Sequence, residues 1–125
     1  MSKLSPPLSP SAAAASYAEG LAWQENQQYE TALACYARAA ALQPDYAEAH
    51  WKHGNMLRLL GRPQQALNSY AQAIAVRPDY AIAFNSLANT QLSLGQYQAA
   101  LASYDQAVNL QPNYAEAFNL SLIHI

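Results

Sequence analysis

Residues 47–80 read AEAHWKHGNMLRLLGRPQQALNSYAQAIAVRPDY, and the same pattern starts again over residues 81–114. The two segments carry the same amino acid at 14 of 34 aligned positions. Pro44, Pro78 and Pro112 recur at this interval of 34 residues, each followed by Asp or Asn. Self-similarity at a fixed period of about 20 to 50 residues is typical of repeat architectures, so the interval predicts a stack of similar units.

Each unit predicts a pair of helices joined by a short turn. In the middle unit we expect a first helix over residues 47–60 and a second over 64–76. Between them, Gly61 suits a left-handed helix C-terminus, and Pro63 fits only at the start of a helix. Asp79 is expected to cap the first helix of the next unit. Small and apolar residues of the second helix fall on the spacing of one buried face: Ala66, Leu67, Tyr70, Ala73 and Ile74.

The repeat interval also divides the chain. A Ser- and Pro-rich lead-in, predicted to be flexible, precedes three full units and a truncated fourth, at 1–12, 13–46, 47–80, 81–114 and 115–125. Residues 120–125 depart from the repeat pattern. We interpret them as an adapter-encoded tail foreign to the natural chain, with a short native tail as the alternative. The partial unit leaves an apolar face uncovered, and we expect self-association through that face.

The recurring positions resemble the tetratricopeptide repeat, a helix–turn–helix of 34 residues. The match consists of a small residue in the first helix, then an alanine, an aromatic and another alanine in the second helix, and a closing proline. These residues are Gly20, Ala32, Tyr36, Ala39 and Pro44; Gly54, Ala66, Tyr70, Ala73 and Pro78; and Ala88, Ala100, Tyr104, Ala107 and Pro112. The resemblance implies an all-α fold, a right-handed superhelical stack of antiparallel helix pairs whose first helices line a concave groove.

Two histidines depart from the family pattern. His50 and His53 in unit two, like Ser16 and Glu19 in unit one, stand where the repeat usually has a large residue and a leucine, so we expect units one and two to pack less tightly. A helical His-x-x-His pair could bind a metal ion, but no Asp, Glu or Cys is placed to complete such a site. We therefore interpret both residues as structural and predict neither a metal nor a cofactor.

Composition narrows the class of partner. Apolar residues make up 52% of the chain and charged residues 11%, which predicts an ordered core. The net charge is −2 and the six basic residues are scattered, so neither nucleic acid nor a membrane surface is expected as a partner. Cys35 is the only cysteine and cannot form an internal disulfide. No signal peptide or membrane-spanning run is recognised, so a cytoplasmic location is the default expectation.

The groove is the expected site of function. No nucleophile elbow, phosphate loop or paired-carboxylate site occurs, so we predict a protein that is not an enzyme. Repeat register gives six candidate peptide-binding residues: Tyr17, Trp51, Asn55, Arg58, Asn85 and Asn89. Asn55 and Asn89 occupy the same place in successive units, so their amides could bond the backbone of an extended peptide. The alternative is that asparagine is simply common at this position.

The resemblance implies a protein–protein interaction scaffold that binds a peptide or helix. Some family members grip the C-terminal carboxylate of heat-shock chaperones with lysine, arginine and asparagine. The matching positions here keep at most Lys52 or Asn55, and Glu116 has the wrong sign. As an alternative function, the run at 44–50 resembles the arrays that precede glycosyltransferases related to the O-linked N-acetylglucosamine transferases. The chain would then be the substrate-recruiting arm of a larger enzyme.

Overall fold

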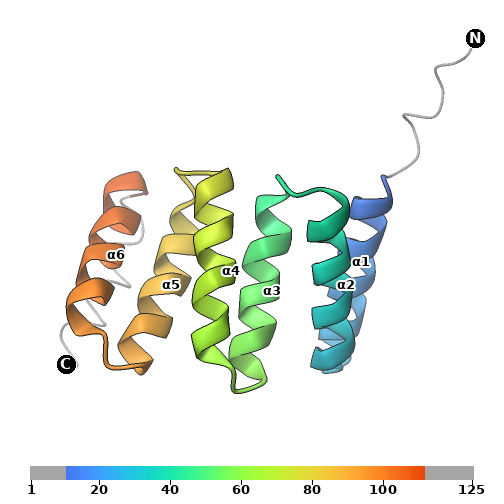
Figure 1. The fold of residues 1–125 in the computed structure, drawn as a ribbon, viewed down its shortest axis with the longest axis horizontal. Helices are drawn as coiled ribbons and strands as arrows, with labels where there is room; N and C mark the ends of the chain where they lie inside the picture. The colour runs from blue at the N-terminus through green and yellow to red at the C-terminus, as the bar shows by residue number, and fades with distance from the viewer. Residues whose placement is uncertain (1–10, 112–125) are drawn as a thin grey trace, which may run out of the picture.

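The computed structural model describes residues 11–111, which form six α-helices and contain no strand. The helices are α1 (Ala12–Glu25), α2 (Tyr29–Leu42), α3 (Ala47–Leu59), α4 (Pro63–Val76), α5 (Ala81–Ser93) and α6 (Tyr97–Leu110). Figure 1 shows them side by side in chain order, each running opposite to the one before it. The prediction of an all-α stack of helix pairs is confirmed.

The core lies where the two helices of each pair cross. In each pair, a tyrosine of the second helix is buried, and these three are among the largest fully covered side chains: Tyr36, Tyr70 and Tyr104. The rings of Tyr36 and Tyr70 lie directly against Gly20 and Gly54 of the preceding helix. Successive pairs are joined chiefly by contacts of α2 with α3 and of α4 with α5. The first helix of each pair is thus packed against a buried tyrosine of the second helix.

The turns within the pairs require a left-handed residue. Gly61 and Gly95 have φ angles of +78° and +79°, which a glycine adopts without steric cost. In the first pair, Gln27 occupies the same repeat position with a φ of +62°. The expected turns are therefore present in all three pairs, although the first is made by a residue that disfavours this conformation.

Three details of the sequence prediction are corrected. Helix α3 ends at Leu59, since Leu60 is its C-cap, and α4 already begins at Pro63. Asp79 does not cap α5. The N-cap is Tyr80, with no side-chain capping bond, because a turn closed by the Tyr80 N–H and the Arg77 carbonyl leaves Asp79 one residue too early.

The predicted lead-in is described only from Ser11 onward, where Ser11 caps α1 through a 3.0 Å bond from the Ala14 N–H to its Oγ. The predictions of a truncated fourth unit, a foreign tail and a self-associating face fall within residues 112–125 and lie outside the described residues. In the part that is described, none of the helices has the length and apolarity needed to span a membrane.

Candidate functional site

The first helices of all three pairs border a common hollow of about 410 Å³. Its lining comes from α1, α3 and α5: Gln24, Asn55, Met56, Arg58, Leu59 and Ser86. Most of this lining belongs to α3, which has a helix pair on each side. The hollow therefore combines amide, hydroxyl, guanidinium and apolar side chains along one face of the stack.

Each pair contains a hydrogen bond from its buried tyrosine to an amide on its first helix. The hydroxyl of Tyr36 donates to Oε1 of Gln24 at 2.6 Å, and that of Tyr70 donates to Oδ1 of Asn55 at 2.5 Å. Tyr104 donates to Oδ1 of Asn89 in the same way. The predicted asparagines are thus held in place by the core, and their first role is to satisfy a buried phenol.

Arg58 fixes the direction of the bond at Asn55. Its Nη1 lies 3.4 Å from the Tyr70 hydroxyl, and a guanidinium can only donate. The Tyr70 oxygen therefore accepts from Arg58, and its single hydrogen goes to Asn55. Burial raises the pKa of Tyr70, although Arg58 opposes this shift, so the phenol keeps its proton at neutral pH. Asn55 is left with an amide NH₂ that no described residue binds.

Two of the six predicted site residues, Asn55 and Arg58, line the hollow. Asn85 is half-buried, as is Asn89, and neither belongs to the lining. Tyr17 packs inside the first pair, where its ring centroid lies 5.5 Å from that of Tyr36 and 5.1 Å from that of Tyr46. Burial, together with Glu48 and Tyr46, raises the pKa of Tyr17 to about 12. Tyr17 is thus partly a packing residue.

Trp51 joins two repeats. Its Nε1 donates to Oγ of Ser86 on α5 at 2.9 Å, and its ring centroid lies 6.0 Å from that of Tyr80. The ammonium of Lys52 lies 5.0 Å from the Trp51 ring centroid, and burial lowers the pKa of Lys52. The indole of Trp51 is therefore bonded to Ser86 at the edge of the hollow, and Trp51 itself does not line the hollow.

Met56, Leu59 and Ser86 line the hollow but were not predicted to do so. Leu59 lies four residues after Asn55 and three after Met56 along α3, so helical spacing was the available signal for both. The pairing of Gln24 with Tyr36 was not foreseen. Gln24 lies about one helical turn after Leu21, which is the position in α1 that corresponds to Asn55. Its side chain nevertheless reaches Tyr36, the tyrosine equivalent to Tyr70.

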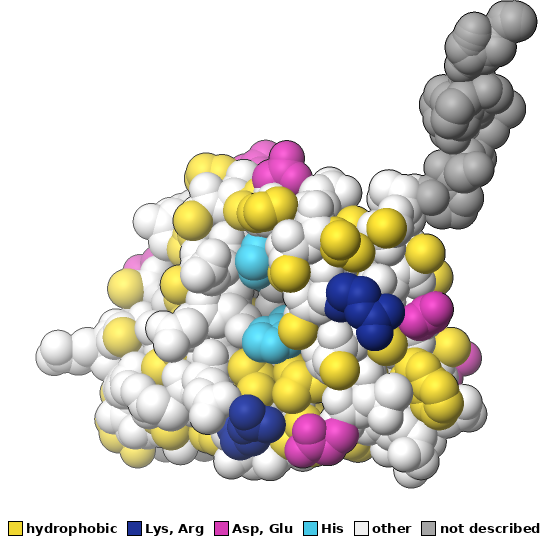
Figure 2. Space-filling model, turned by 45° about the vertical axis from the view of Figure 1, so that its right-hand side comes forward, with side chains coloured by type: hydrophobic (Ala, Val, Ile, Leu, Met, Phe, Trp, Pro, Cys, Tyr) yellow, Lys and Arg dark blue, Asp and Glu magenta, His cyan; other side chains and the backbone are white. Residues whose placement is uncertain are grey.

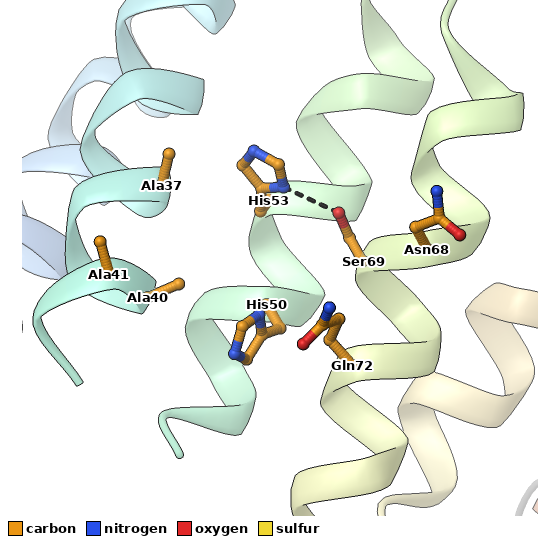
Figure 3. A pocket seen from close by; sticks show the side chains of 8 residues that line it. All are labelled: Ala37, Ala40, Ala41, His50, His53, Asn68, Ser69 and Gln72. Atoms are coloured by element: carbon orange, nitrogen blue, oxygen red, sulfur yellow. Dashed lines mark hydrogen bonds between the residues drawn. The ribbon is translucent and has the colours of Figure 1, made fainter. Parts of the chain in front are cut away.

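The two histidines of α3 border a second hollow, of about 330 Å³, between α2 and α4. Figure 3 shows both imidazoles entering this space, with alanines on the α2 side and amides on the α4 side. His53 shares a 2.7 Å hydrogen bond with Oγ of Ser69, and Nε2 of His50 lies 2.9 Å from the Pro44 carbonyl. The described residues contain no cluster of three or more His, Cys, Asp or Glu that could hold a metal ion. Cys35 lies apart and is buried.

Comparison with known families agrees with this architecture. A family model described as a tetratricopeptide repeat matches residues 45–113, more than half of the chain, and a second one, described as a TPR repeat, matches residues 20–55. The chain therefore belongs to the tetratricopeptide repeat family. No curated protein matches it.

Solved structures share the fold at low sequence identity. MamA has a TM-score of 0.78 and 24% identity, over 88% of this chain and 64% of its own. The first TPR of Spaghetti (RPAP3), bound to the HSP90 peptide SRMEEVD, has a TM-score of 0.83 and 20% identity, over 86% of each chain. The protein described here thus spans under two thirds of the MamA chain and nearly all of the RPAP3 repeat domain.

Proposed function

We propose that this protein is an interaction scaffold that binds a segment of a partner polypeptide in the hollow formed by α1, α3 and α5. The observation that carries the proposal is that three separate helices contribute polar and apolar side chains to one continuous site of about 410 Å³. The described lining residues carry amide, hydroxyl, guanidinium and apolar groups, which suit the binding of a polypeptide segment.

The chemistry of the lining favours an extended peptide. The amide NH₂ of Asn55 supplies donors for a main-chain carbonyl, and the exposed side chain of Leu59 supplies apolar contact, while Met56 is buried beneath them. Arg58 is exposed and forms no ion pair within residues 11–111, so it suits an acidic side chain of the ligand. We therefore expect a peptide that contains an Asp or Glu next to an apolar residue.

The RPAP3 repeat domain, whose fold is similar, is itself bound to a peptide, SRMEEVD, of HSP90. That peptide is not our candidate ligand. Tyr17 and Leu21 occupy two of the positions that grip a terminal carboxylate in chaperone-binding members of the family, and neither side chain is basic. Because Arg58 is the only cation among the described residues that line the hollow, we expect recognition of an internal acidic residue instead.

No observation favours the alternative that the chain is the recruiting arm of a glycosyltransferase. The family matches are to repeats, and the hollow contains only the features of a binding surface.

A display library of random peptides tests the proposal. Peptides enriched on the protein should bind at least about tenfold more weakly to Asn55→Ala and to Arg58→Ala, which is about 1.4 kcal/mol each. Asn109→Ala is the matched control, because Asn109 is an exposed asparagine of α6 that does not line this hollow, and binding should be unchanged. Failure to enrich any peptide, or an equal loss in Asn109→Ala, would refute the assignment.

A further inference from the structure

The second hollow, between α2 and α4, is not explained by peptide binding in the groove. It is bordered by Ala37, Ala40 and Ala41 of α2, His50 and His53 of α3, and Asn68, Ser69 and Gln72 of α4. Figure 2 shows the two histidine side chains within a depression that is open at the surface. At about 330 Å³, the space is near the lower end of the range for ligand pockets, which is about 300 to 1,000 Å³.

The next repeat shows what this place in the fold normally holds. One repeat later, four of the wall residues are unchanged: Ala37, Ala41, Ser69 and Gln72 correspond to Ala71, Ala75, Ser103 and Gln106. Four residues differ. Ala40, His50, His53 and Asn68 correspond to Ile74, Phe84, Leu87 and Ala102. The hollow therefore has the walls of an ordinary repeat seam, but imidazoles replace a phenyl ring and a leucine side chain, and Ala40 lacks the three further carbons of an isoleucine.

The charge of the hollow restricts the occupant. No lining residue is a Lys, Arg, Asp or Glu, and His50 and His53 are its only titratable groups. Burial, followed by the neighbouring His50 and Arg62, lowers the pKa of His53, so this imidazole is neutral at pH 7. A charged group would enter this space without a fixed counter-charge, which is unfavourable. An uncharged group is the complementary one.

We propose that this hollow is a second binding site, which takes the uncharged aromatic side chain of a partner protein, with tyrosine as the best fit. The ring takes the space that the short side chain of Ala40 leaves open, and it packs between the alanines of α2 and the imidazoles of α3. The amides of Asn68 and Gln72 lie on the α4 side and provide partners for a phenol hydroxyl. The site lies between the second helices, so it is separate from the peptide groove.

Two probes test the site on the full chain. The first is p-cresol, the side chain of tyrosine, and the second is a blocked Ala-Ala-Tyr-Ala-Ala peptide. Both should shift the imidazole proton resonances of His50 and His53 saturably. Cyclohexanol, which has a similar size and a hydroxyl but no aromatic ring, is the matched control and should produce smaller shifts that do not saturate.

The variant Ala40→Ile, His50→Phe, His53→Leu fills the hollow with the residues of the next repeat. It should lose binding of both probes, which can be followed through the amide resonances of Asn68 and Gln72, and it should melt at a higher temperature. His53→Leu alone is the second variant in case the triple substitution disturbs folding, and it should weaken binding several-fold. The site is refuted if neither probe binds or if a folded, filled variant binds p-cresol unchanged. Binding of p-cresol without the peptide would refute a protein partner, and saturable binding of cyclohexanol would refute aromatic selectivity.

Discussion

Gly54 of α3 lies so close to Tyr70 of α4 that a Cβ at Gly54 would be 2.7 Å from Cε1 of the ring. Real Cβ atoms essentially never come this close to a carbon, so the glycine sets the distance between the two helices. The same ring places the hydroxyl that orients Asn55. Helix spacing in the middle repeat and the arrangement of the groove therefore depend on a single contact.

Substitution of Gly54 by alanine should lower stability. Helix propensity alone would favour alanine by about 1 kcal/mol. Overpacking against the buried Tyr70 ring costs about 1–3 kcal/mol and should exceed that gain. We expect a net loss of about 1 kcal/mol, measured by urea unfolding. In the third pair, Ala88 already occupies the position equivalent to Gly54. A Gly54→Ala variant more stable than the parent would show that α3 and α4 can move apart to accommodate the added methyl group.

Ala73→Leu should cost about 1–3 kcal/mol of unfolding free energy. Ala73 has no exposed surface and packs in a cluster with Ala47, Tyr80 and Ala83, so three further carbons have no space there. Ala71→Leu, at an exposed position of the same helix, is the control and should change stability by less than about 0.5 kcal/mol. Equal melting temperatures for the two variants would contradict the packing described for α4.

Gln27→Gly should stabilise the first pair by about 0.5–1 kcal/mol. The φ of +62° at Gln27 brings Cβ close to the backbone, whereas glycine adopts this angle freely, as Gly61 does in the second pair. Gln28 has a φ of −93°, so Gln28→Gly should not stabilise the protein. Thermal unfolding of both variants distinguishes relief of strain from a general effect of glycine in the turn.

The stability of the protein should fall in mild acid because of His53. Its folded-state pKa lies below the ordinary 6.5 because of burial, His50 and Arg62 in that order, while α2 contributes only alanines and α4 the neutral Ser69, Asn68 and Gln72. The unfolded chain therefore takes up a proton first as the pH falls below 6.5, and stability decreases until the folded-state pKa is passed.

His53→Leu should remove this part of the pH dependence between pH 7.5 and pH 5, as measured by melting temperature. The remaining slope then belongs to the other titratable groups. If the parent and the variant lost stability in parallel over this range, His53 would not be the group responsible.

The helix pairs could be predicted from local chemistry, because Gly61 and Pro63 act within a few residues of the helix ends that they define. The 34-residue interval then extends this prediction to the other two pairs. The groove could be predicted only in part. Repeat register indicated Asn55 and Arg58, but it could not show that Trp51 turns toward Ser86, since that bond joins residues 35 positions apart. Register indicates the face of a helix on which a residue lies, and side-chain conformation then depends on the neighbouring repeat.

The histidine hollow was missed for a related reason. His50 and His53 were interpreted one helix at a time, as structural residues, and each does form a hydrogen bond. The space appears only when Ala40 of the preceding repeat is considered with them, because residues from both sides of the seam border it. A position-by-position comparison with Ile74, Phe84 and Leu87 would have indicated it from the sequence.

The hollow bordered by His50 and His53 also affects how the stack of repeats unfolds. In a stack of repeats, stability is the sum of a term for each unit and a coupling term for each pair of neighbours. The hollow between α2 and α4 weakens the coupling of the first unit to the second relative to a filled seam. In hydrogen exchange, α1 and α2 should therefore open at a higher free energy in the variant Ala40→Ile, His50→Phe, His53→Leu than in the parent. Helix α6, which does not border the hollow, is the internal control.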